Sequence, residues 1–194
     1  MDEFKHLFNQ SVLRSFSRFI HKHGDERPYA LAISTGQTCN YLGFAVATEE
    51  KLVQTARDYA AELSYRYEAH KWENDNLQEK LQIWLRWSNP DDGWYYKDFD
   101  NSDKLQQFLK RLSKQENCDE QLECLCIESL RLLVRETVWQ ELTLPFSTTI
   151  GITPGENPDD FLRTATMIND YSTTMRLWSE YHQIRELDAR LGGS

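Results

Sequence analysis

Acidic residues gather around one aromatic-rich stretch, RWSNPDDGWYY, which covers residues 86–96. Asp91 and Asp92 lie inside it, and Asp98 and Asp100 follow it. Neighbouring carboxylates can hold a divalent cation or share a proton, so these residues are the first candidates for chemistry. The spacing does not match a calcium-binding loop, and Asn-Pro-Asp-Asp-Gly is ordinary turn chemistry, because Pro fixes φ and Gly supplies φ > 0. We therefore expect turn and capping roles, with no metal bound.

Large rings surround the same carboxylates and are the second candidates. They are Trp84, Trp87, Trp94, Tyr95 and Tyr96. Such rings dominate both hydrophobic cores and interface hot spots. Because side chains alternate along an extended chain, we expect one or two rings to be exposed or covered by another segment, although packing under helices is the competing interpretation. An aromatic centre with an acidic rim suits a basic protein partner. The predicted partner-binding residues are Asp91, Asp92, Trp94, Asp98 and Asp100.

Other chemistry-bearing residues form no recognisable motif. His21 and His23 are two apart, whereas a helical metal pair usually has i,i+4 spacing. The chain contains no G-x-S-x-G, G-x-G-x-x-G or P-loop sequence. The cysteines do not form paired C-x-x-C units, so we interpret them as thiols, with Cys124 and Cys126 packed and Cys118 a candidate exposed thiol. We expect no catalytic residue and no cofactor.

Hydrophobic periodicity predicts the elements that position these residues. Apolar side chains recur every three or four residues over 3–22, which predicts an amphipathic helix. The apolar runs 29–35 and 41–48 predict a β-hairpin with one face against helices, and Thr48 is placed to cap the helix that follows. Residues 81–87 alternate apolar and polar side chains; we predict a strand, with a helical extension as the alternative.

The second half of the chain is mainly helical by the same criteria. Ser102 is predicted to cap a helix, and a longer helix follows over 122–134. FSTTIGIT, after Pro145, predicts another strand, Asn157-Pro158 begins a helix, and a last helix covers about 172–191. The expected fold class is α+β, with a small, mainly antiparallel sheet packed against several helices. We expect one domain over residues 1–191 and a flexible tail over 192–194.

Charge and hydropathy bound the possible partners. The 194 residues carry a formal net charge of −9, which disfavours nucleic-acid binding and is compatible with a basic protein partner. No run of about eighteen apolar residues predicts a transmembrane helix. The start MDEFKHLFNQ lacks the basic and apolar segments of a signal peptide. We therefore expect a cytoplasmic protein without membrane association.

The order of these segments resembles a bacterial family, the domain of unknown function family 4303, over roughly residues 4–170. The landmarks are Tyr29-Ala30-Leu31, Thr48-Glu49-Glu50, Arg86-Trp87-Ser88 with Trp94, LPFSTTIGIT and INDY. Two features depart from the family pattern. Ala47 stands where the family tends to have Asn, and Thr153-Pro154-Gly155-Glu156 replaces an acidic turn.

The resemblance implies no established reaction, but members resemble proteins encoded in bacterial toxin–immunity neighbourhoods. It therefore predicts a cytoplasmic immunity protein that neutralises a cognate toxin by occluding it. One alternative is an uncharacterised enzyme or small-ligand sensor with a pocket between sheet and helices. Another is a homo-oligomer whose exposed rings form a self-interface.

Overall fold

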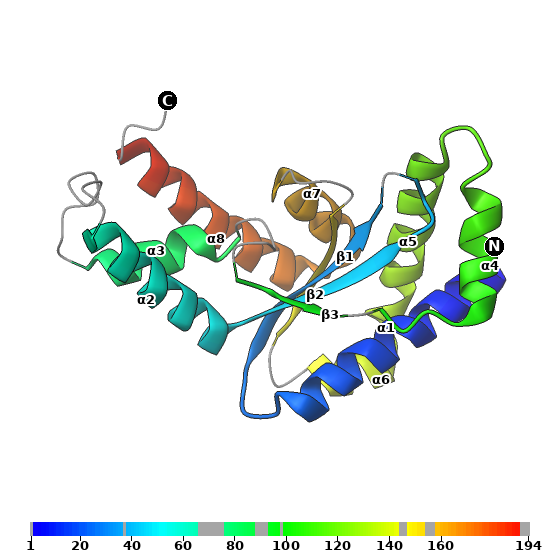
Figure 1. Cartoon of the computed structure of the whole chain (residues 1–194), viewed down its shortest axis with the longest axis horizontal. Coiled ribbons are helices and arrows are strands. Elements are labelled where there is room, and N and C mark those ends of the chain that lie inside the picture. Colours follow the sequence, from blue (N-terminus) through cyan, green and yellow to red (C-terminus); the bar gives the residue numbers. More distant parts are fainter. Residues whose placement is uncertain are drawn as a thin grey trace.

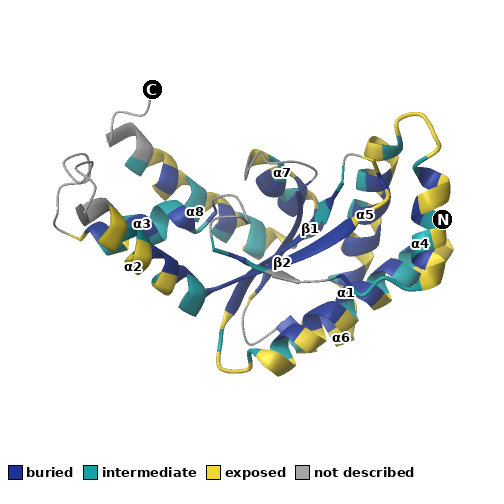
Figure 2. Cartoon of the chain, viewed as in Figure 1, coloured by how far each residue is buried: buried dark blue, intermediate teal, exposed yellow. Residues whose placement is uncertain are grey.

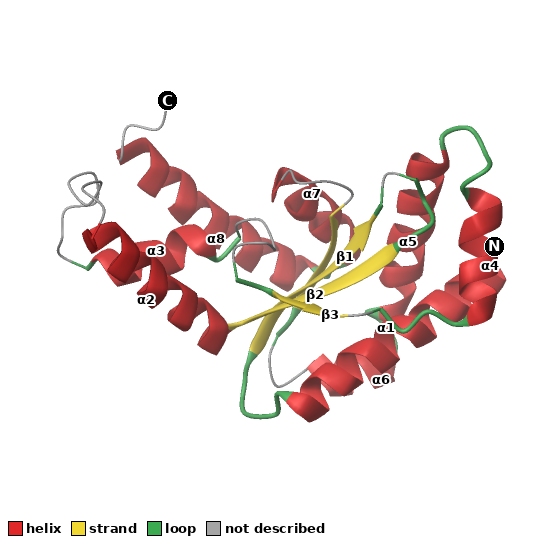
Figure 3. Cartoon of the chain, viewed as in Figure 1, coloured by secondary structure: helices red, strands yellow, loops and turns green. Residues whose placement is uncertain are grey.

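The structure is a computed structural model, and it describes residues 2–36, 38–65, 76–87, 93–97, 99–143, 147–153 and 158–190. The strands are β1 (Pro28–Thr35), β2 (Leu42–Thr48), β3 (Tyr95–Lys97) and β4 (Thr149–Thr153). The helices are α1 (Asp2–Lys22), α2 (Glu49–Tyr65), α3 (Leu77–Leu85), α4 (Asp103–Leu112), α5 (Cys118–Leu133), α6 (Thr137–Thr143), α7 (Pro158–Ile168) and α8 (Tyr171–Arg190). Helices and strands are coloured separately in Figure 3. The predicted α+β class is confirmed.

The four strands form one sheet in the order β3-β2-β1-β4. β1 pairs with β2 as the predicted antiparallel hairpin, and β2 pairs antiparallel with β3. β4 instead pairs parallel with β1, because the helices between β2 and β4 carry the chain back to the same end of the sheet. The sheet is therefore mixed rather than purely antiparallel.

The two faces of the sheet pack against different helices (Figure 1), and the strands between them are largely buried (Figure 2). The faces also differ in side-chain size. One face carries large side chains, including Leu31, Ile33 and Phe44, and packs against α1, α4, α5 and α6. The other face carries small residues. They are Ala30, Ala32, Ala45, Ala47 and Gly151. Rings and aliphatic side chains of α2, α3, α7 and α8 fill the space that these small residues leave.

A β-bulge in β1 explains how a tyrosine joins the small-residue face. The register of β1 against β2 shifts between Pro28 and Ala30. Tyr29 and Ala30 consequently belong to the same hydrophobic cluster, although neighbours on a regular strand point to opposite faces. The bulge therefore turns the Tyr29 ring toward the layer that contains α2, α3 and α8.

Two predictions about capping are confirmed. The Thr48 hydroxyl accepts a hydrogen bond of 3.1 Å from the Lys51 backbone N–H at the start of α2. Ser102 accepts one of 3.3 Å from Leu105 N–H at the start of α4. Each side chain satisfies a backbone donor that the first helical turn leaves without a partner.

The strand predicted over residues 81–87 is wrong. Leu77, Leu81 and Leu85 are buried on one face of helix α3, at i,i+4 spacing. The spacing of Leu81 and Leu85 fits both a strand and a helix. The helix is favoured because it packs its leucine face against α2 and α8. The strand of this region is instead β3, whose Tyr95 pairs with Val46.

Several predictions concern residues outside the described part of the chain. Pro145, Asn157 and the tail predicted at 192–194 are outside the described residues. The assignment of residues 1–191 to one domain stays a prediction. Among the described residues, none of the helices has the length and apolar character needed to cross a membrane.

Gly151 provides a test of the packing on the small-residue face. A Cβ at this position would lie 2.7 Å from two Phe161 ring carbons. We expect Gly151→Ala to lower the free energy of unfolding by about 1–3 kcal/mol, as overpacking does in other cores. Urea denaturation measures this loss. In the Phe161→Leu background, which removes the obstructing ring, the added methyl should cost less; an equal cost in both backgrounds would contradict the packing argument.

Candidate functional site

Of the predicted partner-binding residues, Trp94 is buried rather than exposed. Its side chain is 8% accessible. The ring packs edge-on against Phe161, with centroids 5.6 Å apart, and against Tyr29 at 6.3 Å. The Trp94 ring is therefore part of the core, because the alanine and glycine side of the sheet leaves room for it there. Its role in partner binding stays a prediction.

Asp100 is half-buried and has cationic partners within the chain. It lies 2.8 Å from Arg14 Nε and 3.2 Å from Arg18 Nη2, both on α1. Its backbone N–H also donates to Ser15 Oγ at 3.0 Å. Asp100 thus ties the segment before α4 to α1, and its charge is already offset. Asp91, Asp92 and Asp98 lie outside the described residues.

The other large rings of residues 84–96 do not form one exposed surface among the described residues. Trp87 is buried and stacks on Phe161 at 5.7 Å, while Trp84 is half-buried against the same cluster. Tyr95 is half-buried and packs against the opposite cluster. The side chain of Tyr96 is not described. For Trp87 and Trp94, the competing interpretation as core residues is confirmed.

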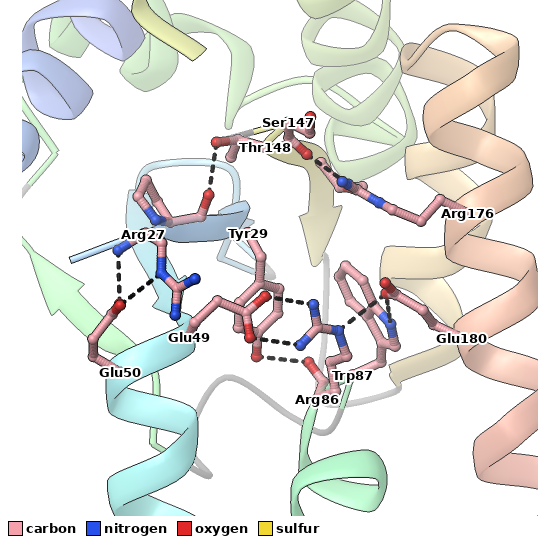
Figure 4. Close-up of polar contacts among 12 residues, drawn as sticks. Arg27, Tyr29, Glu49, Glu50, Arg86, Trp87, Ser147, Thr148, Arg176 and Glu180 are labelled. Carbon is pink, nitrogen blue, oxygen red and sulfur yellow. Dashed lines mark hydrogen bonds and ion pairs between the residues drawn. The ribbon is translucent and has the colours of Figure 1, made fainter. Parts of the chain in front are cut away.

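The strongest polar arrangement is centred on Arg86, directly after α3 (Figure 4). Its Nη1 and Nη2 atoms donate to the two oxygens of Glu49 at 2.9 and 2.6 Å. Its Nε donates to Glu180 at 3.1 Å, and Trp87 Nε1 donates to the same Glu180 oxygen at 3.0 Å. The guanidinium lies 4.4 Å from the centre of the Tyr29 ring. One cation therefore joins α2, the end of α3 and α8.

The electrostatics of this cluster keep Arg86 charged. Burial disfavours the cation, but the bonds to Glu49 and the charges of Glu180 and Glu49 outweigh it, so the pKa of Arg86 is raised. Burial also raises the pKa of Tyr29, which stays a neutral phenol and donates to the Arg86 carbonyl at 2.9 Å. All three guanidinium nitrogens have carboxylate partners, so this cluster is a structural clamp rather than a site for chemistry.

Sequence reasoning missed this clamp. Glu49 follows Thr48, the correctly predicted helix cap, and Arg86 is the first residue of the aromatic-rich segment 86–96. Glu180 gave no local signal, because 94 residues separate it from Arg86 along the chain. A long-range ion pair of this kind has no periodicity that a single sequence displays.

Polar contacts also fix the orientation of α8. Arg176 Nη2 donates to the Ser147 carbonyl at 2.6 Å and to Thr149 Oγ1 at 2.7 Å (Figure 4). Tyr181 donates to Asp159 of α7. Together with Glu180 and the buried Leu177, these contacts determine which side of α8 faces the protein.

The opposite side of α8 carries large exposed side chains. Tyr171 is 79% accessible, Met175 50% and Trp178 41%. His182 continues the series and has its ring 6.3 Å from that of Trp178. The spacing of four, three and four residues places them along one face of the helix. We call these four residues the α8 face. Single exposed apolar residues are normal, but an ordered row with Tyr and Trp is typical of an interaction surface.

A cavity of about 440 Å³ opens beside the start of α8. Its lining includes Arg135, Trp139, Gln140, Asn169 and Asp170. Asn169 is occupied within the chain: its amide donates to the carbonyls of Ile150 and Ala165, and it accepts from Ile150 N–H. Asp170 accepts from Thr173 N–H, so the start of α8 is capped internally. The part of the chain that the structure describes contains no group of three or more His, Cys, Asp or Glu residues placed to hold a metal ion.

The fold and these surfaces define an α+β protein with a partly buried ionic clamp and an exposed aromatic helix face. Residues 9–144 match the family described as Domain of unknown function (DUF4303), and the chain belongs to this family. The match includes Glu49 and Arg86 of the clamp, whereas α8 lies beyond it. Comparisons with curated proteins and with solved structures gave no match.

The clamp gives a stability prediction with a matched control. Arg86→Met leaves Glu49 and Glu180 without their cation, and we expect it to lower the free energy of unfolding by about 3–5 kcal/mol. Arg27 also pairs with a carboxylate of α2, Glu50, at 2.8 Å, but its side chain is 70% exposed, against 22% for Arg86. Arg27→Met should therefore cost no more than about 1 kcal/mol. Denaturant unfolding of both variants measures these losses. If both substitutions lowered the free energy of unfolding by the same small amount, the stabilising role of the clamp would be ruled out.

A second network, around Glu26, gives a pH dependence. Partial burial opposes ionisation of Glu26, but hydrogen bonds with Thr48, His23 and Tyr95 outweigh it and lower its pKa below 4.5. Burial and Glu26 together raise the pKa of Tyr95 to about 12, which keeps this phenol a donor at neutral pH. A carboxylate whose pKa is lowered by folding stabilises the folded state above its unfolded pKa, and loses that effect as the pH falls through its folded pKa.

We therefore expect Glu26→Gln to be less stable than wild type at pH 7, with the difference shrinking as the pH falls below about 4.5. Denaturant titrations between pH 7 and pH 3 measure this convergence. Glu116→Gln, at an exposed position, is the control and should show no such trend. If the difference in free energy of unfolding between Glu26→Gln and wild type stayed constant over this pH range, the claim that folding lowers the pKa of Glu26 would be contradicted.

Proposed function

We propose that the protein is a cytoplasmic immunity-type binding protein that neutralises a basic toxin domain by occluding the toxin's active face. The observation that carries the proposal is the α8 face, an exposed row of aromatic and methionine side chains on a chain with a net charge of −9. Tyr, Trp and Met are enriched in the buried centres of protein interfaces. Occlusion of this kind requires no cofactor.

Charge favours a basic partner over a neutral one. The exposed Asp170 and Glu186 lie near the two ends of the α8 face. Carboxylates around an apolar centre attract a cationic surface, accelerate the encounter and fix its orientation. Asp100 lies against α1, where Arg14 and Arg18 already pair with it, so it is not part of this surface. Asp91, Asp92 and Asp98 lie outside the described residues, and their contribution to partner binding stays a prediction.

The mechanism is steric and electrostatic. Tyr171 and Trp178 would enter the interface as rigid anchors, since a ring loses little conformational entropy when it is immobilised. Arg176, Glu180 and Tyr181 already fix α8 against the body of the protein, so the face is preorganised. A toxin that acts on nucleic acid presents a cationic surface, which suits an acidic inhibitor.

The test is binding to the proposed toxin partner, which is sought among the proteins encoded beside the gene of this protein. Trp178→Ala should weaken binding by roughly 30-fold or more, because truncating an interface anchor typically costs 2 kcal/mol or more. Leu132→Ala is the matched control, since Leu132 is also exposed, at 49%, but lies on α5; it should leave affinity within about twofold. Calorimetry or surface plasmon resonance gives the affinities.

Two outcomes would overturn the proposal. The first is wild-type protein that neither binds the adjacent toxin nor protects cells from it. The second is an affinity that Trp178→Ala leaves unchanged, which would remove the α8 face from the interface. Added salt should slow association, because attraction between an acidic surface and a basic one is screened.

The cavity beside α8 favours a second candidate, an enzyme or small-ligand sensor. Its volume of about 440 Å³ lies within the range of small-molecule sites, and Arg135 and Gln140 contribute polar groups to its lining. A metabolite that raises the melting temperature of wild type but not of Gln140→Ala would support this function.

Light scattering tests the homo-oligomer, for which the α8 face would be the contact between copies.

A further inference from the structure

Three of the four thiols converge on one place in the core. Cys39 lies in the turn between β1 and β2, Cys118 is the first residue of α5, and Cys126 lies two turns further along α5. Cys39 and Cys126 belong to the cluster on the large-residue face of the sheet, and Cys118 packs against that cluster. Cys124 points away and is exposed, contrary to the expectation that it is packed.

Cys39 and Cys118 are direct neighbours although 79 positions separate them along the chain. Burial and, after it, the contact with the Cys118 side chain together raise the pKa of the Cys39 thiol to about 12. The backbone of Cys39 adopts φ = 55°, which is uncommon for a residue with a Cβ. Its N–H donates to the Gly36 carbonyl at 2.9 Å, so the turn holds this thiol against α5.

The accessibility of the two thiols differs in a useful way. Cys39 is fully buried, whereas Cys118 is half-buried and can be reached from solvent. An oxidant can therefore reach Cys118 first, and the buried Cys39 thiol lies next to it. When an accessible thiol is oxidised to a sulfenic acid beside a second thiol, the two condense to a disulfide, and oxidation to sulfinic or sulfonic acid is avoided.

The geometry points to Cys39 and Cys118 as an oxidative modification site, at which a peroxide converts the pair to a disulfide. The Cys118 thiolate attacks one peroxide oxygen; the O–O bond breaks, an S–O bond forms, and the other oxygen leaves as water after protonation. The Cys39 sulfur then attacks the Cys118 sulfenic acid, the S–S bond forms, and the hydroxyl leaves with the Cys39 proton as a second water. Two thiols and one hydrogen peroxide thus give one disulfide and two waters.

The disulfide would join the β1–β2 turn to the start of α5. These two elements lie at the same end of the large-residue core, and the bond closes a long loop of chain. Closing a long loop restricts the unfolded state, so the oxidised protein should melt at a temperature higher by roughly 5–15 °C. The inference stands independently of the proposed binding function, because it concerns the opposite side of the sheet from α2, α3 and α8.

The experiment treats the full-length protein with one equivalent of hydrogen peroxide, blocks the remaining thiols and maps peptides by mass spectrometry. We expect one linked pair of peptides containing Cys39 and Cys118, a mass lower by about two hydrogens, and reversal by dithiothreitol. Cys118→Ser should abolish the link and the rise in melting temperature, while Cys124→Ser, which alters the exposed thiol, should retain both.

Other linkages would overturn the inference. A Cys39–Cys126 link, a dimer joined through Cys124, or a Cys118 that accumulates as sulfinic acid in native protein would each show that Cys39 does not resolve Cys118. Mapping of wild-type protein decides the matter even where a serine substitution at the buried Cys39 prevents folding.

Discussion

One partly buried charge holds together the layer of α2, α3 and α8. The Arg86 guanidinium is largely removed from water, and the isolated cation would be strongly destabilising there. Glu49 at the start of α2 and Glu180 on α8 offset that cost, so these helices must approach the end of α3 at fixed positions. The Tyr29 ring lies against the guanidinium and, through the bulge in β1, connects the clamp to the sheet. Because Glu180 holds one side of α8 against Arg86, the opposite side, which carries the α8 face, is turned to solvent.

The sheet separates two different kinds of packing. Large aliphatic and aromatic side chains fill the face against α1, α4, α5 and α6, and the core there resembles that of many α+β domains. The opposite face is built from alanines and Gly151, which allow Trp87, Trp94 and Phe161 to approach the strands closely. The aromatic richness of the segment around residue 87 is thus explained by the volume that small strand residues leave. It does not require those rings to meet a partner.

Local patterns predicted the local features of the fold. The face of α1, the β1–β2 hairpin, the strand β4 and the caps Thr48 and Ser102 follow from periodicity and from the chemistry of helix starts. The parallel pairing of β4, the burial of Trp94 and the Arg86–Glu180 pair depend on residues far apart in sequence. The α8 face was predictable in principle from Tyr171, Met175 and Trp178 at helical spacing. Exposure, however, is decided by which side of α8 the clamp turns inward, and that is a property of the assembled structure.

The central claim is that the α8 face contacts a basic protein partner. Hydroxyl-radical footprinting of the complex with the proposed toxin partner tests it directly, because Met, Trp and Tyr side chains are the ones that such radicals oxidise readily. The account predicts that Tyr171, Met175 and Trp178 become protected in the complex, while Tyr41, which is 54% exposed and lies before β2, reacts as it does in the free protein. Equal labelling of the α8 face in free and bound protein would contradict the account.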